Sequence, residues 1–467
     1  MPLDQSFRHQ VLRGSAYLSF RLAAGAGLGL IGISLLTRFI GPTNYGIFTA
    51  AHAVLSYTVT LTEYGIGVYL LRLDRDAPDE FHQALTLLLL FSAGGVLLVL
   101  GVIILIEHAF DLREIRFAIF ALIMGLPVVH LVKVPMARLE RNLDYKRVAM
   151  IELVSNIGYY IVALAVAYRG GGIGAPVAGW WAQQLIQLVQ VYHTGYRPRL
   201  LWRGAIAKRM LSFGSAYSAY LLVYAARDLV NPLIVGSILG PAAVGYAALA
   251  GRVVEQLGFV RTASIRISVA AFSRLGSDPA RLARTISEGM FLQILAIGPL
   301  LCAFSLLAPI AIPFAFGSQW MPVSRIFPWL GVAAMITSMF QLHSSTLTLL
   351  GMNYKQALSQ LVRLVLFAVL TALLVSHFGA EGYGMAELAS LPVSCVLLHC
   401  WVRAHTEHIR YLHALLWLLA FTLPLFARDL GSLVWVSVVA PLIWPGTRRD
   451  LLTFRDSLTK KNKIETQ

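Results

Sequence analysis

The chain has 467 residues, of which 57% are hydrophobic and 13% are charged, and its mean hydropathy is +0.70. These values exclude a water-soluble globular domain of this size and indicate a protein whose solvent is the lipid bilayer. The net charge of +15 does not indicate nucleic-acid binding, because Lys and Arg lie in short clusters between apolar stretches. Cys302, Cys395 and Cys400 all lie in apolar stretches, so we expect neither a disulfide framework nor a thiolate metal site.

Apolar stretches long enough to cross a bilayer, which takes about 20 residues, follow one another along most of the chain. The first is longer than the apolar region of a signal peptide, so we expect an uncleaved helix. The first six predicted spans are 15–39, 45–71, 83–107, 115–136, 147–168 and 174–196. After a basic link, the next six are 211–239, 243–270, 287–315, 320–350, 355–376 and 380–403. Two shorter stretches, 412–427 and 430–445, precede a polar tail and predict a tight hairpin.

This division predicts an all-α polytopic membrane protein with about fourteen transmembrane helices. We expect four parts. They are an N-lobe at 1–196, a basic cytoplasmic linker at 197–210, a C-lobe at 211–403, and a C-terminal helix pair with a cytoplasmic tail at 404–467.

The distribution of Lys and Arg predicts the orientation of the chain. On the assigned loops, 26 of these residues fall on one side of the membrane and six on the other. Cytoplasmic loops carry the excess of positive charge, so both termini are predicted to be cytoplasmic and the number of spans even. The six residues on the other, non-cytoplasmic side are Arg38, Arg113, Arg116, Arg169, Arg325 and Arg428.

An internal repeat relates the two six-helix sets. Gly14-Ser15-Ala16-Tyr17 recurs as Gly214-Ser215-Ala216-Tyr217, and Ile40-Gly41-Pro42 with Gly46 recurs as Leu239-Gly240-Pro241 with Gly245. Because each set has an even number of spans, the repeats are predicted to be parallel about an axis along the membrane normal. Paired bundles of this kind enclose a central cavity that opens alternately to each side, so the repeat favours a transporter.

Two short motifs resemble a known family. The first is Thr37-Arg38-Phe39-Ile40-Gly41-Pro42-Thr43-Asn44-Tyr45-Gly46, which is similar to an R-x-L-G-P-x-x-Y-G corner between the first two helices. The second is Thr62-Glu63-Tyr64-Gly65-Ile66-Gly67, which is similar to a D-L-G-L stretch with Glu63 in the usual Asp place. The chain thereby resembles the polysaccharide exporters, or Wzx-type O-antigen and exopolysaccharide flippases, of the multidrug/oligosaccharidyl-lipid/polysaccharide superfamily.

The resemblance implies a flippase of the bacterial inner membrane that works by alternating access. It implies translocation of an undecaprenyl-diphosphate-linked glycan from the cytoplasmic to the periplasmic leaflet, for O-antigen, lipopolysaccharide or exopolysaccharide assembly. The polysaccharide polymerase and the chain-length machinery are then candidate partner proteins. The last two helices resemble those that accommodate the lipid tail in lipid II flippases.

Arginines within the predicted spans are candidates to bind the diphosphate. A charge at the bilayer centre costs about 2.5 to 3.5 kcal/mol, so charges kept there face a cavity or a partner, and the planar guanidinium matches phosphate. In order of preference the candidates are Arg227, Arg252 and Arg261, then Arg21 and Arg363. The alternatives are that Arg227 and Arg252 pair with Asp228 and Glu255, and that Arg21 and Arg363 extend to the membrane edge.

Carboxylates within the spans are candidates for proton coupling, because burial raises the pKa of a carboxyl group. They are Glu63, Asp228, Glu255 and Glu387, and the alternative for each is an ion pair with a neighbouring Arg.

Other motif matches are rejected. Gly27-x-Gly29-x-x-Gly32 lies inside an apolar helix without a preceding strand, so it indicates helix packing instead of dinucleotide binding. His405, His408 and His413 are typical of a solvated segment, and no metal or other cofactor is expected. The acidic run Asp74, Asp76, Asp79 and Glu80 predicts a hydrated loop.

Two rival functions stay open. A drug or organic-cation exporter of the same superfamily would favour acidic residues in its cavity. A membrane glycosyltransferase, polymerase or ligase would normally carry an extended loop outside the membrane, whereas the predicted non-cytoplasmic loops are short. We therefore expect a transporter and not an enzyme.

Overall fold

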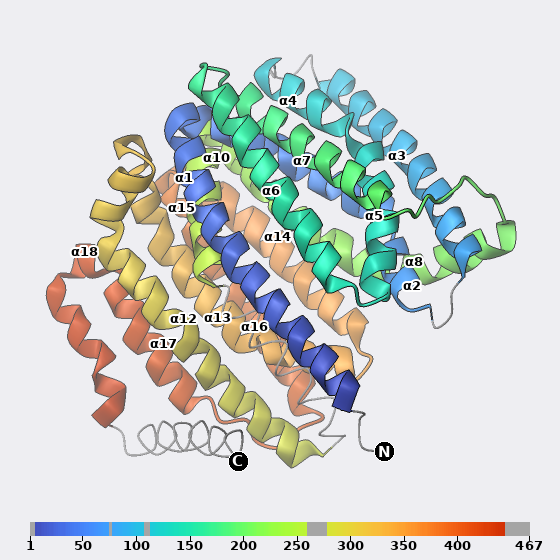
Figure 1. The fold of residues 1–467 in the computed structure, drawn as a ribbon. Helices are drawn as coiled ribbons and strands as arrows, with labels where there is room; N and C mark the ends of the chain where they lie inside the picture. Colours follow the sequence, from blue (N-terminus) through green and yellow to red (C-terminus); the bar gives the residue numbers. More distant parts are fainter. Residues whose placement is uncertain (1–4, 74–76, 107–112, 259–277, 444–467) are drawn as a thin grey trace. The chain divides into compact units, whose positions relative to one another are not determined.

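The computed structural model describes residues 5–73, 77–106, 113–258 and 278–443, and this part of the chain is helical with no strand (Figure 1). Within these ranges, eight helices are long and apolar enough to cross a membrane. Large apolar side chains such as Leu105, Ile310 and Phe314 are exposed, as expected where lipid replaces water. The predicted all-α, multi-pass membrane class is confirmed, and the total of fourteen spans stays a prediction.

The helices in the first half are α1 (Gln5–Glu63), α2 (Ile66–Leu71), α3 (Pro78–Ile106), α4 (Arg113–Ile123), α5 (Leu126–Arg141), α6 (Tyr145–Tyr168), α7 (Gly174–His193), α8 (Gly204–Ala226), α9 (Gly236–Leu239) and α10 (Pro241–Leu257). Those in the second half are α12 (Pro279–Ala315), α13 (Val323–Leu349), α14 (Asn353–Phe378), α15 (Glu381–Ala389), α16 (Leu391–Arg403), α17 (Leu412–Leu425) and α18 (Ala427–Leu430). A 3-10 turn (Arg227–Leu229) and a π-helical turn (Asn231–Val235) join α8 to α9. Short 3-10 segments lie at Ser318–Trp320, Ser432–Val438 and Ala440–Ile443.

The chain divides into two compact units, which are described separately. Unit 1 comprises Met1–Leu249, Phe314–Trp320 and Leu364–Tyr383. Unit 2 comprises Ala250–Pro313, Met321–Arg363 and Gly384–Gln467.

The two repeated Gly-Pro corners pack against each other within unit 1. Gly41 and Gly240 have nearly the same left-handed backbone, with φ of 76° and 82° and ψ of 172° and 177°. A Cβ at Gly46 would overlap the Pro241 carbonyl oxygen, and one at Gly245 would overlap the Pro42 carbonyl oxygen. This reciprocal approach confirms that the predicted sequence repeat is also a structural repeat at the corner.

Trp320 secures the short segment Phe314–Trp320 to the first corner. Its ring is fully buried and lies 5.7 Å from the ring of Tyr45 and 5.8 Å from that of Tyr246, centroid to centroid. Its indole N–H donates to the Thr37 carbonyl oxygen at 3.3 Å. Aromatic edge contacts and a satisfied indole therefore fix the surroundings of the corner.

The basic link after α7 is bound to the first turn of α3. Arg203 pairs with Asp79 at 2.7 Å, and Arg209 pairs with Glu80 at 2.8 Å. Acidic residues are favourable at a helix N-terminus, which explains why α3 begins there. The predicted hydrated loop is therefore wrong for Asp79 and Glu80, whereas Asp74 and Asp76 lie outside the described residues.

Unit 2 brings α12, α13 and α17 side by side (Figure 1). A Cβ at Gly289 would overlap Leu342 of α13, and a Cβ at Gly298 would overlap Phe421 of α17, so both glycines permit close packing. The 3-10 segment Ser432–Val438 returns along α17, where the Ser437 hydroxyl donates to the Ala420 carbonyl at 2.8 Å.

Candidate functional site

A polar pocket of about 340 Å³ lies within unit 1, in the range of small-molecule sites. It is lined from α1, α2, α5, α6 and α7 by six polar side chains: Glu63, Lys133, Glu140, Glu152, Gln184 and Gln187. Apolar groups that include Val68, Leu71, Val129 and Met136 complete its lining. We call this cavity the polar pocket.

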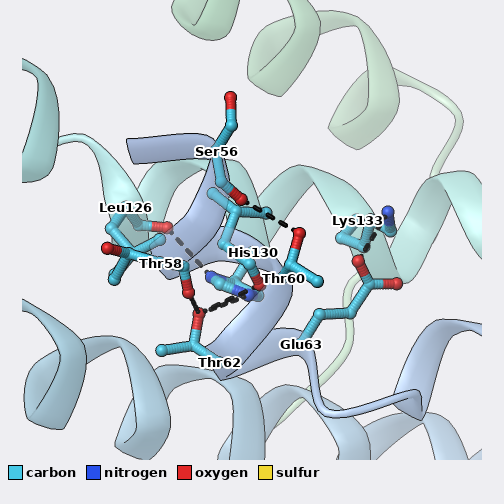
Figure 2. A network of polar contacts seen from close by, with 9 residues as sticks. Ser56, Thr58, Thr60, Thr62, Glu63, Leu126, His130 and Lys133 are labelled. Atoms are coloured by element: carbon cyan, nitrogen blue, oxygen red, sulfur yellow. Dashed lines mark hydrogen bonds and ion pairs between the residues drawn. The ribbon is translucent and has the colours of Figure 1, made fainter. Parts of the chain in front are cut away.

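The polar pocket contains an ion pair between Glu63 and Lys133, whose atoms lie 3.1 Å apart (Figure 2). Glu63 is the last residue of α1, where the partial negative charge of the helix end disfavours a carboxylate. Lys133 of α5 compensates for that charge. The side chains are 21% and 43% exposed, so both remain within reach of a molecule in the pocket.

A sharp backbone turn creates the space around Glu63. Tyr64 and Gly65 have positive φ of 47° and 70°, which ends α1 and redirects the chain into α2. One turn later, a Cβ at Gly67 would overlap the Glu63 carboxylate. The Glu63-Tyr64-Gly65-Ile66-Gly67 motif thus combines a charge, a turn and the room that the charge needs.

Behind the ion pair, the buried His130 joins three helices (Figure 2). Its Nδ1 lies 2.9 Å from the Ser92 hydroxyl of α3 and 3.1 Å from the Leu126 carbonyl oxygen, and its Nε2 lies 3.4 Å from the Thr62 hydroxyl of α1. Because a carbonyl oxygen can only accept, we assign the proton to Nδ1. Thr62 precedes Glu63 and His130 lies one turn before Lys133, so this network holds the two charges in register.

Side-chain amides fix α7 against α6 along the pocket wall. Gln183 donates to the Asn156 side-chain oxygen at 2.6 Å, and Gln187 donates to the Ser155 hydroxyl at 3.2 Å. Such bonds between membrane helices are worth about 0.6 to 2 kcal/mol each. They set the positions of Glu152 on α6 and Gln184 on α7, which both face the pocket.

The pocket lining has three carboxylates and one ammonium group, which give it a formal charge of minus two. It offers both hydrogen-bond acceptors and donors. No group of three or more His, Cys, Asp or Glu residues in the described part of the chain has the geometry of a metal site.

Of the predicted site residues, Arg227 and Asp228 also lie in unit 1. They form the 3-10 turn that follows α8. The Arg227 guanidinium lies 5.7 Å from the centroid of the Phe367 ring, within cation–π range, and Asp228 is exposed.

Four further predicted residues form two ion pairs in unit 2. Arg252 and Glu255 are 3.4 Å apart on one face of α10, with side chains 49% and 71% exposed. Arg363 of α14 and Glu387 of α15 are 2.5 Å apart, with side chains only 9% and 4% exposed. Arg261 lies outside the described residues, as does the Arg21 side chain.

Unit 2 also contains a cluster of the buried His343 with the partly buried His399 and Tyr411. The Tyr411 hydroxyl lies 2.6 Å from His343 Nε2 and 2.7 Å from His399 Nδ1. Burial raises the pKa of the Tyr411 phenol, which keeps it protonated. The cluster joins α13 and α16 to the start of α17.

Sequence reasoning identified Glu63 as a candidate but missed the rest of the pocket. Lys133 falls inside the predicted span 115–136 but is not among the candidate site residues, although it lies in α5 beside Glu63. Glu140, Glu152, Gln184 and Gln187 were not singled out. The sequence feature that could have located the pocket wall is the group of four glutamines within the predicted span that became α7. They are Gln183, Gln184, Gln187 and Gln190.

The comparisons with known proteins agree on one family and one fold. Residues 35–325 match the family described as "Polysaccharide biosynthesis protein". The chain is 20% identical over 344 residues to the lipopolysaccharide biosynthesis protein WzxC of Escherichia coli (strain K12), covering 71% of this chain and 68% of that protein. It is 23% identical over 390 residues to the succinoglycan biosynthesis transport protein ExoT of Rhizobium meliloti (strain 1021), covering 81% and 75%.

Among solved structures, the lipid II flippase MurJ in an inward closed conformation has the same fold. The TM-score is 0.71 at 14% sequence identity, and the match covers 97% of this chain and 100% of that one. At this identity the match establishes the fold alone.

Proposed function

The chain belongs to the polysaccharide biosynthesis protein family, and from that premise we propose that it is a flippase for a polyprenyl-diphosphate-linked oligosaccharide. The observation that carries the proposal is the polar pocket, a cavity with four charged side chains within a strongly apolar, multi-pass chain. Charged groups are costly in such surroundings, and a polar cargo accounts for their retention.

Different residues suit the different parts of this substrate. The exposed apolar surface of the helices suits the polyprenyl tail, as in any lipid-facing protein. We retain Arg227 and Arg252 as ligands of the diphosphate, with Arg261 and Arg21 as further candidates, because a guanidinium binds phosphate in a bidentate manner. Arg363 is nearly buried against Glu387, so we assign that pair a structural role.

The proposed direction is from the cytoplasmic to the periplasmic leaflet of the inner membrane, with both termini cytoplasmic. The loop charges support this orientation. We further propose alternating access between an N-lobe (1–196) and a C-lobe (211–403), and assembly with the polysaccharide polymerase and chain-length machinery. No catalytic step by this chain is part of the proposal.

The negative pocket favours one second candidate, an exporter of organic cations driven by protons. Glu63 lines the pocket and is its best candidate carboxylate, while Asp228 and Glu255 remain candidates elsewhere and Glu387 belongs to the structural pair with Arg363. Export of a cationic dye driven by a pH gradient would support this alternative.

Purified protein in liposomes tests the two functions together. An undecaprenyl-diphosphate-linked oligosaccharide is placed in the outer leaflet, and its loss of accessibility to a sugar-oxidising enzyme is followed. We expect loss that depends on the protein, and no movement of ethidium in matched vesicles. Sugar-lipid movement at the rate of protein-free liposomes would overturn the flippase proposal.

A further inference from the structure

The polar pocket has a chemistry that selects one part of a lipid-linked glycan. Its formal charge of minus two disfavours a diphosphate at short range, because like charges repel most strongly where they are close together. Its six polar side chains would lose hydrogen bonds to water against a polyprenyl tail, which offers none in return, whereas its apolar groups leave room for a ring with both kinds of surface. Of the three parts of the proposed substrate, the sugar is the one that this lining accommodates.

The lining matches the hydrogen bonds of a sugar. Each hydroxyl group of a sugar donates one hydrogen bond and accepts others, so it needs both kinds of partner. Glu140 and Glu152 supply carboxylate acceptors, whereas Gln184 and Lys133 supply donors. The apolar side chains of Val68, Leu71 and Met136 offer contact to the C–H face of a sugar ring.

A small cation fits the pocket less well than a sugar does. A bound Ca²⁺ needs six to eight oxygen ligands within about 2.6 Å. The described residues hold no acidic or histidine group with such geometry, and the pocket volume of about 340 Å³ is that of a site for an organic molecule. Lys133 already balances the carboxylate of Glu63, at 3.1 Å (Figure 2).

We propose that the polar pocket is a sugar subsite that binds an uncharged or amino-substituted sugar of the lipid-linked glycan and discriminates against acidic sugars. The inference rests on the proposed flippase function and adds a specificity to it. Glu152 and Gln184 are the specificity-determining residues, because both line the pocket from the two helices that the amide bonds hold in register. Acidic sugars are disfavoured by the three carboxylates.

Binding to three defined lipids tests the inference. Full-length protein in phosphatidylcholine nanodiscs is titrated with undecaprenyl diphosphate, with the same lipid bearing N-acetylglucosamine, and with the same lipid bearing glucuronic acid. For the wild type we expect the N-acetylglucosamine lipid to bind about tenfold tighter than the sugar-free lipid, the effect of one or two net hydrogen bonds. The glucuronic acid lipid should show no such gain.

Two substitutions locate the preference in the pocket. Glu152→Gln and Gln184→Leu should each reduce the preference for N-acetylglucosamine to less than about threefold, because the first makes a charge-assisted hydrogen bond neutral and the second removes a hydrogen bond. Their affinity for sugar-free undecaprenyl diphosphate, measured in the same titration, is the reference for this ratio. Glu152→Lys should reverse the selectivity and improve binding of the glucuronic acid lipid. Glu288→Gln, an exposed carboxylate on α12, is the matched control and should behave as wild type.

The outcomes separate the inference from the proposed function. Equal preference in the wild type and both pocket variants, or equal binding of all three lipids by the wild type, would overturn the sugar subsite alone. Failure of the wild type to bind any of the three lipids would instead contradict the flippase proposal. Unchanged melting temperatures of the variants verify that they are folded.

Discussion

The polar pocket of unit 1 and the buried polar groups of unit 2 place similar residues in different surroundings. Glu63 and Lys133 are partly exposed and line a cavity. Arg363 and Glu387 also form an ion pair between helices, but less than a tenth of either side chain is exposed. His343 and Tyr411 likewise contact each other in the interior, at 2.6 Å.

The difference separates charges that a ligand can reach from charges that only the fold contacts. A partly exposed pair contributes little to stability but remains available to a ligand. A buried pair has lost its solvent, so removal of one partner leaves a charge that neither water nor a cavity can satisfy. Substitutions in the buried pair of unit 2 should therefore lower stability, and substitutions in the pocket should lower function.

The largest expected effect is that of Arg363→Ala. It removes the guanidinium 2.5 Å from the buried Glu387 and should destabilise the protein by about 3 to 5 kcal/mol. Protein abundance in the membrane and thermal melting in detergent measure this loss. The double substitution Arg363→Met with Glu387→Met should restore abundance, and continued loss in the double variant would contradict the ion-pair explanation.

Gly46→Ala tests whether unit 1 also contains purely structural positions. The added methyl group would overlap the Pro241 carbonyl oxygen in the paired corner, so we expect a loss of about 1 to 3 kcal/mol. Gly94→Ala is the control, because no heavy atom of another described segment lies within 4 Å of the methyl group that it adds. Equal melting temperatures of the two variants would argue against close packing at the corner.

Tyr411→Phe removes the hydroxyl group that both His343 and His399 contact. Loss of a hydrogen bond of this kind costs about 0.5 to 1.5 kcal/mol. Hydrogen exchange in α17 should increase, because Tyr411 is the N-cap residue that directly precedes this helix. Unchanged exchange in α17, with the melting temperature of the wild type, would show that the cluster does not hold this helix.

The smallest effect on stability is expected for Lys133→Met. Its pair with Glu63 is partly exposed, so its loss should change stability by only about 0 to 1 kcal/mol. Transport by the folded protein should fall, since the pocket loses its cationic donor. A melting temperature as low as that of Arg363→Ala would contradict this expectation, because it would show that Lys133 stabilises the fold as the buried pair does.

The fold class was accessible from the sequence because hydrophobic length and loop charge follow directly from bilayer thickness. The repeat was also readable, since the positive φ at Gly41 and Gly240 demands glycine in both copies. The partners of charged residues were not readable. Lys133 lies only three residues from the predicted end of its span, where a Lys commonly extends to the membrane edge, and only the packing of α5 against α1 brings it to Glu63.

The acidic turn at Asp79 and Glu80 was mispredicted for the same reason. Its partners, Arg203 and Arg209, lie more than 120 residues away in the chain. Periodicity and composition report on local structure, whereas these contacts depend on tertiary packing. The pocket amides are also ambiguous locally, because a Gln in a membrane helix serves helix packing as well as binding.

The translocation rate per folded molecule tests most directly whether the pocket serves the cargo and the buried pair serves the fold. Glu152→Gln is compared with the double variant Arg363→Met and Glu387→Met in liposomes that contain equal amounts of folded protein. We predict about a tenfold lower rate of sugar-lipid translocation for Glu152→Gln, because a charge-assisted hydrogen bond becomes a neutral one, and a rate close to wild type for the double variant. A normal rate for Glu152→Gln together with a lost rate for the double variant would contradict this division of roles.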